Sequence, residues 1–210
     1  MESYRTIETR GEGSYEEKKS RFLGVAIPTE TEEEVQAALQ EEKKKYYDAK
    51  HHCYACILGE KGELRRFSDD GEPQGTAGKP ILTVLEGQNL RNVCIIVTRY
   101  FGGTLLGTGG LTRAYGEAAK RAVEAAGPLV MQPGKILRIT MDYSLLDRVN
   151  WYLKKQEIKT LTTAYAEKAR EEILVREDQL PALTSFLSQT GSGSIQADIS
   201  KEGFFGFGET

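Results

Sequence analysis

The chain has 210 residues, of which 39% are hydrophobic and 28% are charged, and its formal net charge at pH 7 is -3. These values are typical of a globular protein and argue against long disordered regions. The small acidic excess argues against a general nucleic-acid clamp, so a phosphate-binding surface would have to be a local patch.

Membrane and secretory features are missing from the sequence pattern. No apolar stretch is long enough to span a bilayer, and the first residues lack the basic and apolar regions of a secretory signal. Three cysteines do not suggest a disulfide framework. We therefore expect a protein of the reducing cytoplasm that makes no contact with a membrane.

The first region, residues 1–130, mixes strand and helix patterns. We expect a helix at residues 32–46, where Thr31 and Glu34 have the spacing of a capping box. Residues 81–85 are apolar and fit a short helix or a strand. Gly127 follows a second helical pattern, as is common at a helix end. The other expected elements are strands at 4–9, 21–27, 51–58, 64–67 and 93–97 and a long helix at 111–126.

The second region, residues 134–203, has a regular order of elements. The pattern gives strands at 136–141, 158–165, 172–175 and 194–199, and helical faces around 145–153 and 180–187. The order βαββαβ predicts a ferredoxin-like sandwich. The whole chain is therefore expected to be α+β, with a domain boundary at residues 131–134. Residues 204–210 are expected to form a mobile tail beyond this core.

The strongest candidate site is the Gly-rich segment 98–115, which follows a buried strand and leads into a helix. Amides of a first helical turn are unpaired and lie at the positive end of the helix dipole, an arrangement that suits an anion. The alternative is that the glycines only form a tight connection. The segment does not match the dinucleotide or P-loop motifs. The candidate anion- or RNA-binding residues are Arg99, Tyr100, Gly102, Gly103, Gly107, Gly109, Gly110 and Arg113, together with Lys79.

A second candidate is the acidic stretch that contains Asp69, Asp70 and Glu72. These carboxylates could bind a hard cation or act as a general base, and they could equally cap a turn. Turn and capping roles are the favoured interpretation. His51 is included in this possible polar or cation site because one histidine could face the Gly-rich loop.

Cys53 and Cys56 form a Cys-x-x-Cys pair next to two histidines. The spacing invites zinc or redox chemistry. On a strand, however, residues three apart face opposite sides of the sheet, and no second ligand pair exists in the sequence. We therefore favour core packing for both cysteines and expect no metal ion and no cofactor.

These motifs resemble the signature of the YigZ/IMPACT family, in its bacterial two-domain form. The resemblance rests on Asp69-Asp-Gly-Glu-Pro-Gln-Gly-Thr-Ala-Gly-Lys-Pro80, on Thr98-Arg-Tyr-Phe-Gly-Gly103 and on Leu106-Gly-Thr-Gly-Gly-Leu-Thr-Arg-Ala-Tyr115. It covers essentially the whole chain. It implies a first domain of the β-α type found in some ribosomal proteins, in a translocating elongation factor and in small-molecule kinases. It also implies a second domain akin to the last domain of that factor.

The resemblance further implies a link to translation. Eukaryotic relatives regulate the response to amino-acid starvation through a protein partner, with an additional N-terminal domain, so that function does not transfer whole. The proline dipeptidase label of some relatives finds no metal-ligand set in this sequence. Leu105 stands where many relatives have Lys, and Cys56 is not part of the family pattern.

Three functions remain open from the sequence. The first is contact with RNA or the ribosome through the Gly-rich loop, Arg99, Arg113 and Lys79. The second is an enzyme acting on a phosphorylated small molecule or nucleotide, with Asp69, Asp70 or Glu72 as metal ligand or base, although no particular reaction is supported. The third is a protein-binding regulator that uses the C-terminal half.

Overall fold

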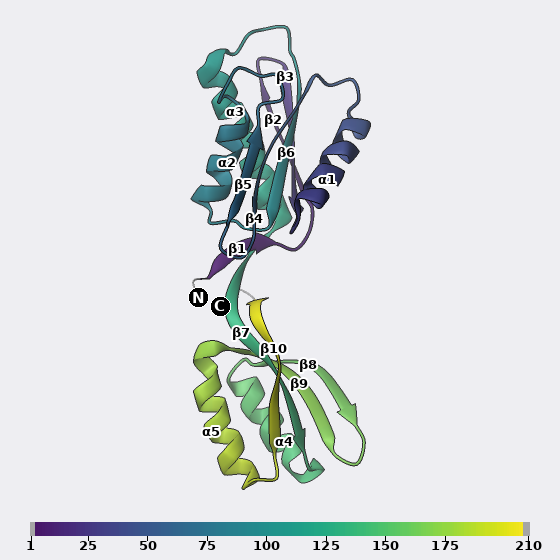
Figure 1. Ribbon diagram of the computed structural model, residues 1–210, viewed down its shortest axis with the longest axis vertical. Helices are drawn as coiled ribbons and strands as arrows, with labels where there is room; N and C mark the ends of the chain where they lie inside the picture. The colour runs from purple at the N-terminus through teal and green to yellow at the C-terminus, as the bar shows by residue number, and fades with distance from the viewer. Residues whose placement is uncertain (1–2, 208–210) are drawn as a thin grey trace. The chain divides into compact units, whose positions relative to one another are not determined.

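The computed structural model describes residues 3–207 and divides the chain into two compact units. One unit is Tyr4–Val130, and the other contains Met131–Phe207. Each unit combines helices with an antiparallel sheet, which confirms the expected α+β class (Figure 1). Within the described residues, no helix has both the length and the apolar character needed to cross a bilayer.

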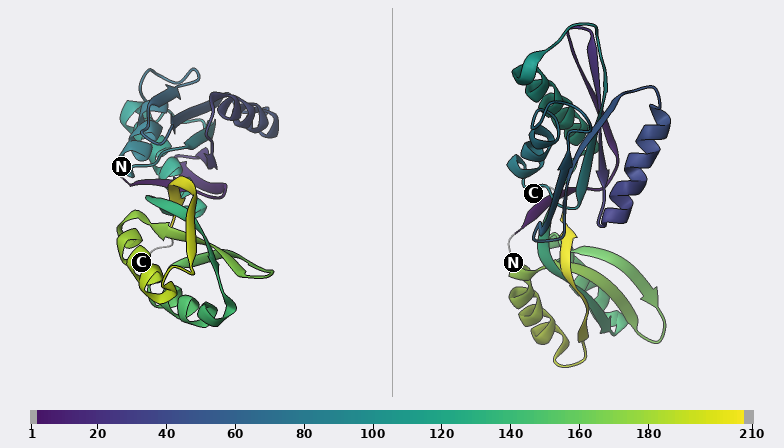
Figure 2. Two further views of the ribbon diagram at one scale, coloured as in Figure 1. Left: turned by 60° about the horizontal axis from the view of Figure 1, so that its bottom comes forward. Right: turned by 45° about the horizontal axis from the view of Figure 1, so that its top comes forward.

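The first unit is built on a five-stranded sheet with the order β2-β3-β6-β4-β5. Helices α2 and α3 cover one face of this sheet and α1 covers the other (Figures 1 and 2). A large apolar core lies under α2 and α3, and a smaller one lies under α1. The elements are β1 (Tyr4–Ile7), β2 (Gly11–Glu17), β3 (Ser20–Pro28), α1 (Glu32–Lys45), β4 (His51–Leu58), β5 (Leu64–Ser68), α2 (Gly78–Gly87), β6 (Val93–Tyr100) and α3 (Gly107–Ala126).

The start of α1 follows the predicted cap. The Thr31 hydroxyl accepts a hydrogen bond from the backbone amide of Glu34 at 3.2 Å. The Glu34 carboxylate in turn accepts from the amide of Glu30 at 2.6 Å, one residue before the position of a standard capping box. The helix expected from residue 32 is thus confirmed, and its start is set by local hydrogen bonds.

Strand β2 was not expected from the sequence, because glycine replaces the apolar residues on its buried face. A Cβ atom at Gly11 or Gly13 would overlap the backbone of α3, so these positions let the helix lie directly on the strand. The β2–β3 hairpin closes through Lys18 and Lys19, which both have positive φ, 47° and 65°. This is the pattern of a two-residue type I′ turn, which usually contains Asn-Gly.

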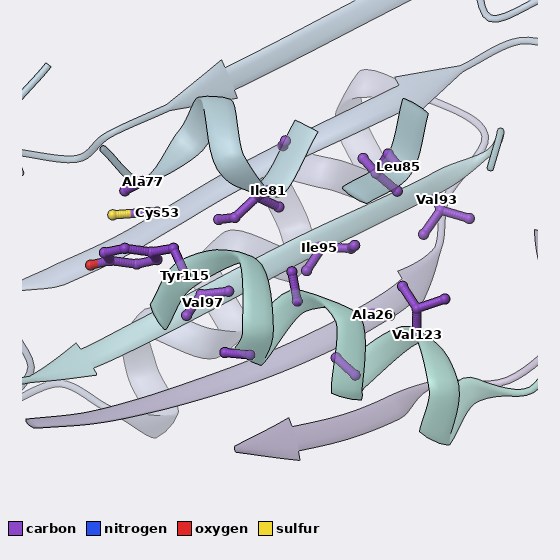
Figure 3. Close-up of a cluster of buried hydrophobic side chains, with 14 of the residues drawn as sticks. Ala26, Cys53, Ala77, Ile81, Leu85, Val93, Ile95, Val97, Tyr115 and Val123 are labelled. Carbon is purple, nitrogen blue, oxygen red and sulfur yellow. The ribbon is translucent and has the colours of Figure 1, made fainter. Parts of the chain in front are cut away.

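Residues 81–85, which fitted either a helix or a strand, lie in α2. Ile81 and Leu85 are one turn apart and both are fully buried in the larger core. Figure 3 shows Ala77, at the start of α2, on the same side of this core as Tyr115, and Leu85 on the same side as Val123. The two helices therefore run in the same direction, and their positive N-terminal ends point to the same end of the sheet.

The second unit has the strand order β10-β7-β9-β8, and all its neighbouring strands are antiparallel. Helices α4 and α5 pack on one face over an apolar core. The elements are β7 (Pro128–Met141), α4 (Tyr143–Lys155), β8 (Lys159–Tyr165), β9 (Ala169–Arg176), a 3-10 turn (Glu177–Gln179), α5 (Leu180–Gly191) and β10 (Gln196–Gly206). The chain passes through residues 131–134 as part of β7.

The prediction of a mobile tail from residue 204 is wrong for residues 204–206. These residues belong to β10, where Phe204 lies opposite Pro133 and Phe205 lies opposite Gln132. The Gly- and Phe-rich composition hid the strand, because its pairing depends on the length of β7 and not on an alternating pattern. Residues 208–210 of the predicted tail, and residues 1–2, lie outside the described part of the chain.

Candidate functional site

The Gly-rich segment contains the start of α3. The helix begins at Gly107 and not at Leu111, so Gly107, Gly109 and Gly110 lie in its first turn. The preceding residue, Leu106, provides no side-chain cap, and the first turn carries no acidic residue. A Cβ atom at Gly107 or Gly109 would meet no atom within 4 Å. The first-turn amides are thus uncapped and accessible, which suits an anionic group.

Arg99, a candidate anion contact, lies inside the first unit. Its side chain is 7% exposed, and its Nη1 atom lies 2.7 and 2.9 Å from the two carboxylate oxygens of Glu72. The hydroxyl of Tyr115 donates to Glu72 Oε1 at 2.7 Å. The charge of Arg99 is therefore balanced within the fold, and Glu72 is occupied by two donors.

One more buried side chain, that of Cys53, belongs to this network. Figure 3 shows the ring of Tyr115, from α3, next to Cys53, from β4. The thiol of Cys53 donates to the backbone carbonyl of Asp69 at 3.0 Å. Burial raises the pKa of Tyr115 and raises the pKa of Cys53 to about 12, so both groups are neutral at physiological pH.

Asp69 caps α2 and shapes the loop before it. Its carboxylate accepts hydrogen bonds from three backbone amides, those of Gly75 at 2.8 Å, Ala77 at 3.1 Å and Gly78 at 2.8 Å. A carboxylate at a helix start is stabilised both by these bonds and by the helix dipole. The capping role favoured from the sequence is the one that the hydrogen bonds of Asp69 support.

His51, Asp70 and Arg99 converge at one end of the sheet. His51 of β4 lies opposite Arg99 of β6 in the strand register, and its Nδ1 atom lies 2.9 Å from the carbonyl oxygen of Asp70. The Asp70 carboxylate accepts from the backbone amide of His52 at 2.7 Å. Within residues 3–207, no cluster of three or more His, Cys, Asp or Glu side chains is arranged to hold a metal ion.

The Gly-rich loop rests on the β2–β3 hairpin. The amide of Gly102 donates to the Ser20 hydroxyl at 3.0 Å, and a Cβ atom at Gly102 would overlap the backbone of Lys19 and Ser20. Arg113 of α3 forms an ion pair with Glu17 of the hairpin at 2.8 Å. Two segments that are distant in sequence, the β2–β3 hairpin and the loop with the first turns of α3, therefore form one continuous surface.

We call this the loop–hairpin surface and define it by the exposed residues Lys18, Lys19, Phe101, Leu105 and Gly107. Phe101 is 58% exposed and Leu105 is 83% exposed. The loop could be identified from the sequence, but both lysines were missed. The gap of two residues between β2 and β3 indicates a tight hairpin turn that contains both lysines. This turn could have been predicted only if the glycines of β2 had been recognised as buried strand positions.

The remaining candidates have separate positions. The hydroxyl of Tyr100 donates to the Asp48 carboxylate at 2.6 Å, and this bond raises the pKa of Tyr100 to about 12. Lys79 is exposed in the first turn of α2. Gly103 has a φ of 87°, a conformation that other residues rarely adopt. Tyr100 and Gly103 thus have clear structural roles, whereas Lys79 is available to a ligand.

The three cysteines are free and buried. Cys53 belongs to the core under α2 and α3, whereas Cys56 belongs to the core under α1. Cys94 of β6 lies directly opposite Cys56 in the strand register. The expected core packing of Cys53 and Cys56 on opposite faces of the sheet is confirmed.

The second unit exposes a group of aromatic side chains that the sequence analysis did not identify. The rings of Tyr143, at the start of α4, and Tyr165, at the end of β8, stack with centroids 6.3 Å apart. Trp151 of α4 is 61% exposed. Tyr143 is fixed by a hydrogen bond from its hydroxyl to the Ala166 carbonyl at 2.7 Å. Exposed aromatic residues of this kind are enriched at protein interfaces.

Comparisons with known proteins cover both units. Residues 18–123 match the model of the Impact N-terminal domain, and residues 139–194 match a domain of unknown function, DUF1949. The chain is 35% identical over 203 residues to the IMPACT family member YvyE of Bacillus subtilis (strain 168), covering 97% of this chain and 92% of that protein. It is 32% identical over 181 residues to the IMPACT family member YigZ of Escherichia coli (strain K12), covering 85% of this chain and 89% of that protein.

Two further proteins are similar to this chain, one with a solved structure and one from a eukaryote. A crystal structure of a hypothetical protein superposes with a TM-score of 0.60 at 31% identity, covering 94% of this chain and 97% of the other. The protein IMPACT homolog of Dictyostelium discoideum is 36% identical over 97 residues, which are 45% of this chain and 28% of that protein. The similarity to this eukaryotic relative is therefore limited to about half of the chain.

Proposed function

The chain belongs to the IMPACT family, and we propose that it is a translation-linked binding protein that contacts RNA, alone or within the ribosome. The contact is made by the loop–hairpin surface of the first unit. The single observation that carries the proposal is the seating of the Gly-rich loop on the Lys18–Lys19 hairpin. It brings two lysines next to the loop that leads into an uncapped helix start.

The charges support a local contact surface on an acidic protein. Lys18 and Lys19 are exposed at the tip of the hairpin, where neither forms an ion pair with the described residues. Arg113 is also exposed, although it is paired with Glu17. Phosphate groups are bound by lysines and by first-turn amides, and neither kind of contact reads sequence. The proposal therefore predicts binding without strong sequence preference.

The residues proposed for this contact differ from those expected from the sequence. Arg99 supports the surface from inside, because its charge is balanced by Glu72. Phosphate binding, expected from the sequence for Arg99, is now proposed for Lys18 and Lys19 of the hairpin. The three carboxylates considered for an enzyme are bound to internal partners, Asp69 to three amides, Asp70 to the amide of His52, and Glu72 to Arg99 and Tyr115.

The test is sedimentation of the full chain with purified ribosomes at about 50 and 200 mM salt. We expect retention at the lower salt and loss at the higher salt, because counterions are released when lysines bind phosphates. The double variant Lys18→Asn/Lys19→Gly removes both charges and introduces the dipeptide that type I′ turns prefer, so the hairpin stays folded. We expect this variant to bind weakly and to show a shallower salt dependence.

The matched control is Lys154→Gln/Lys155→Gln, which removes two adjacent exposed lysines from the end of α4. We expect this control to bind like the wild type. Equal binding by the hairpin variant and the wild type would contradict the proposed surface. Failure of the wild type to bind ribosomes or RNA at low salt would contradict the proposed function as a whole.

A second candidate function is suggested by the exposed aromatic residues of the second unit. We infer that Tyr143, Trp151 and Tyr165 form a contact for a protein partner, because large exposed aromatic side chains dominate the binding energy of many interfaces. We further propose that this unit is the ferredoxin-like sandwich expected from the sequence, supported by its strand order β10-β7-β9-β8. Pull-down from a cell extract with wild type and Trp151→Ala tests the contact, and equal recovery of partners by both would contradict it.

A further inference from the structure

The exposed ring of Phe101 is held in place by the buried network beneath it. The guanidinium carbon of Arg99 lies 5.6 Å from the centre of the Phe101 ring and 5.5 Å from the centre of the buried Phe22 ring. Both distances are within the range of a cation–π contact. Arg99 is in turn fixed by Glu72, and Glu72 by Tyr115. The inner surroundings of Phe101 are therefore fixed by buried groups.

The rest of the Phe101 side chain points to solvent. It is 58% exposed although it follows a buried strand directly. The amide of the next residue, Gly102, donates a hydrogen bond to Ser20, and Gly102 lies against the backbone of Lys19, so the Phe101 backbone is close to the basic hairpin tip. An exposed aromatic ring on the same surface as two lysines fits a ligand that has both a flat apolar face and negative charge.

Unpaired nucleotides have both properties. Their bases offer a flat face that stacks on aromatic rings, and their phosphates bind nearby lysines. In a duplex, the base faces are already stacked on each other and are not available to a side chain. Resting on the proposed RNA-binding function, we propose that the loop–hairpin surface binds single-stranded RNA and that Phe101 is its stacking platform, with Lys18 and Lys19 holding the adjacent phosphates.

The test uses fluorescence anisotropy with a labelled single-stranded RNA of about 12 nucleotides, the length range of one binding surface of this kind, and a duplex of the same length. We expect the wild type to prefer the single strand. Phe101→Ala is expected to weaken single-strand binding by about 5- to 100-fold and to leave duplex binding unchanged, since stacking on one base is lost. Phe101→Trp is expected to retain binding, because the aromatic face is kept.

Phe67→Ala is the matched control, because Phe67 of β5 is also an exposed phenylalanine of the first unit, 49% exposed, but lies outside the loop–hairpin surface. We expect it to bind both RNAs like the wild type. Equal effects of Phe101→Ala on the single strand and the duplex, or no effect on either, would overturn the stacking role while leaving RNA binding intact. Binding of neither RNA by the wild type at low salt would overturn the proposed function together with this inference.

One further outcome separates RNA from protein as the ligand. If Phe101→Ala loses sedimentation with ribosomes but binds free single-stranded RNA like the wild type, the ring contacts a ribosomal protein, and the stacking proposal is overturned. If Phe101→Ala loses both, and Phe101→Trp restores both, the proposal is supported by two independent measurements.

Discussion

Glu72 and Glu171 are both buried carboxylates, one in each unit, but they are satisfied in different ways. Glu72 is bound by the guanidinium of Arg99 and by the hydroxyl of Tyr115. Glu171 of β9 is 2% exposed, and the side-chain amide of Asn150, turned to donate, lies 3.1 and 3.2 Å from its two oxygens. Burial raises the pKa of Glu171, since the single neutral donor does not compensate for lost hydration.

The comparison shows what the first unit gains from its ion pair. A buried ion pair adds little net stability over an apolar pair, but it fixes geometry, because each charge must keep its partner. In the first unit, this requirement fixes Arg99 beneath Phe101. In the second unit, Glu171 faces the same side of β9 as the apolar Ala169 and Ile173, which belong to the core.

The largest expected effect is that of Glu72→Ala. The substitution leaves the charge of Arg99 buried without its carboxylate, which typically costs about 3–5 kcal/mol in the free energy of unfolding. Urea unfolding followed by far-UV circular dichroism measures the loss. Fluorescence of Trp151, the one tryptophan of the chain, reports the second unit separately and is expected to keep its midpoint.

The control for this prediction is the double variant Glu72→Leu/Arg99→Met, which replaces both charges with apolar groups of similar size. We expect it to recover most of the lost stability, since exchange of a complete buried ion pair for apolar residues is often neutral. A cost below about 1 kcal/mol for Glu72→Ala alone would show that Arg99 can reach water, and would contradict the rigid network.

A smaller effect is expected for Tyr115→Phe. The substitution removes one hydrogen bond to Glu72 but keeps the ring, which packs edge-on against Phe22 at 5.1 Å between centroids. A hydrogen bond to a charged group contributes about 1.5–3 kcal/mol, and Arg99 still binds Glu72 in the variant, so a loss near the lower end is expected. The same dichroism measurement checks this, and an unchanged midpoint would mean that water replaces the hydroxyl.

The smallest effect, and one of opposite sign, is expected for Glu171→Gln. The neutral side chain keeps an acceptor for Asn150 without a buried charge. We therefore expect the variant to be more stable than the wild type at pH 8 by about 1 kcal/mol, which is the lower end of the cost of burying a polar group with too few hydrogen bonds. Because the pKa of Glu171 is raised in the folded protein, its destabilising effect grows as pH rises from about 4.5, the ordinary value, through the raised pKa.

Urea unfolding followed by Trp151 fluorescence at pH 5 and pH 8 measures this difference. We expect the advantage of the Glu171→Gln variant to be larger at pH 8. Glu172→Gln is the matched control, because Glu172 faces the other side of the same strand, where it pairs with Arg138 at 3.0 Å in a half-exposed position. A constant advantage of Glu171→Gln at both pH values would contradict the raised pKa.

The elements that could be predicted from the sequence are those whose signals are local. The cap of α1 at Thr31 and the buried strand β6 depend on neighbouring residues and were found. Strand β2 was missed because Gly11 and Gly13 carry no apolar side chain, and their burial depends on α3, more than 100 residues further along the chain. The end of β10 was missed for a similar reason, since its partner is β7.

The candidate site divides in the same way. The Gly-rich segment was identified from composition and from its place between a strand and a helix. The inward position of Arg99 could not be predicted, because its partners Glu72 and Tyr115 come from a loop and a helix on either side of it in sequence. Lys18 and Lys19 became candidates only when the hairpin was seen to support Gly102.

The buried cysteines have a practical consequence for experiments on this protein. All three thiols lie in the two cores of the first unit, and burial raises their pKa values, so they react slowly with thiol reagents. A cysteine introduced at Leu105, which is 83% exposed, would therefore react selectively in the otherwise unmodified chain. A fluorophore or cross-linker could be attached at the edge of the loop–hairpin surface without first removing the native thiols.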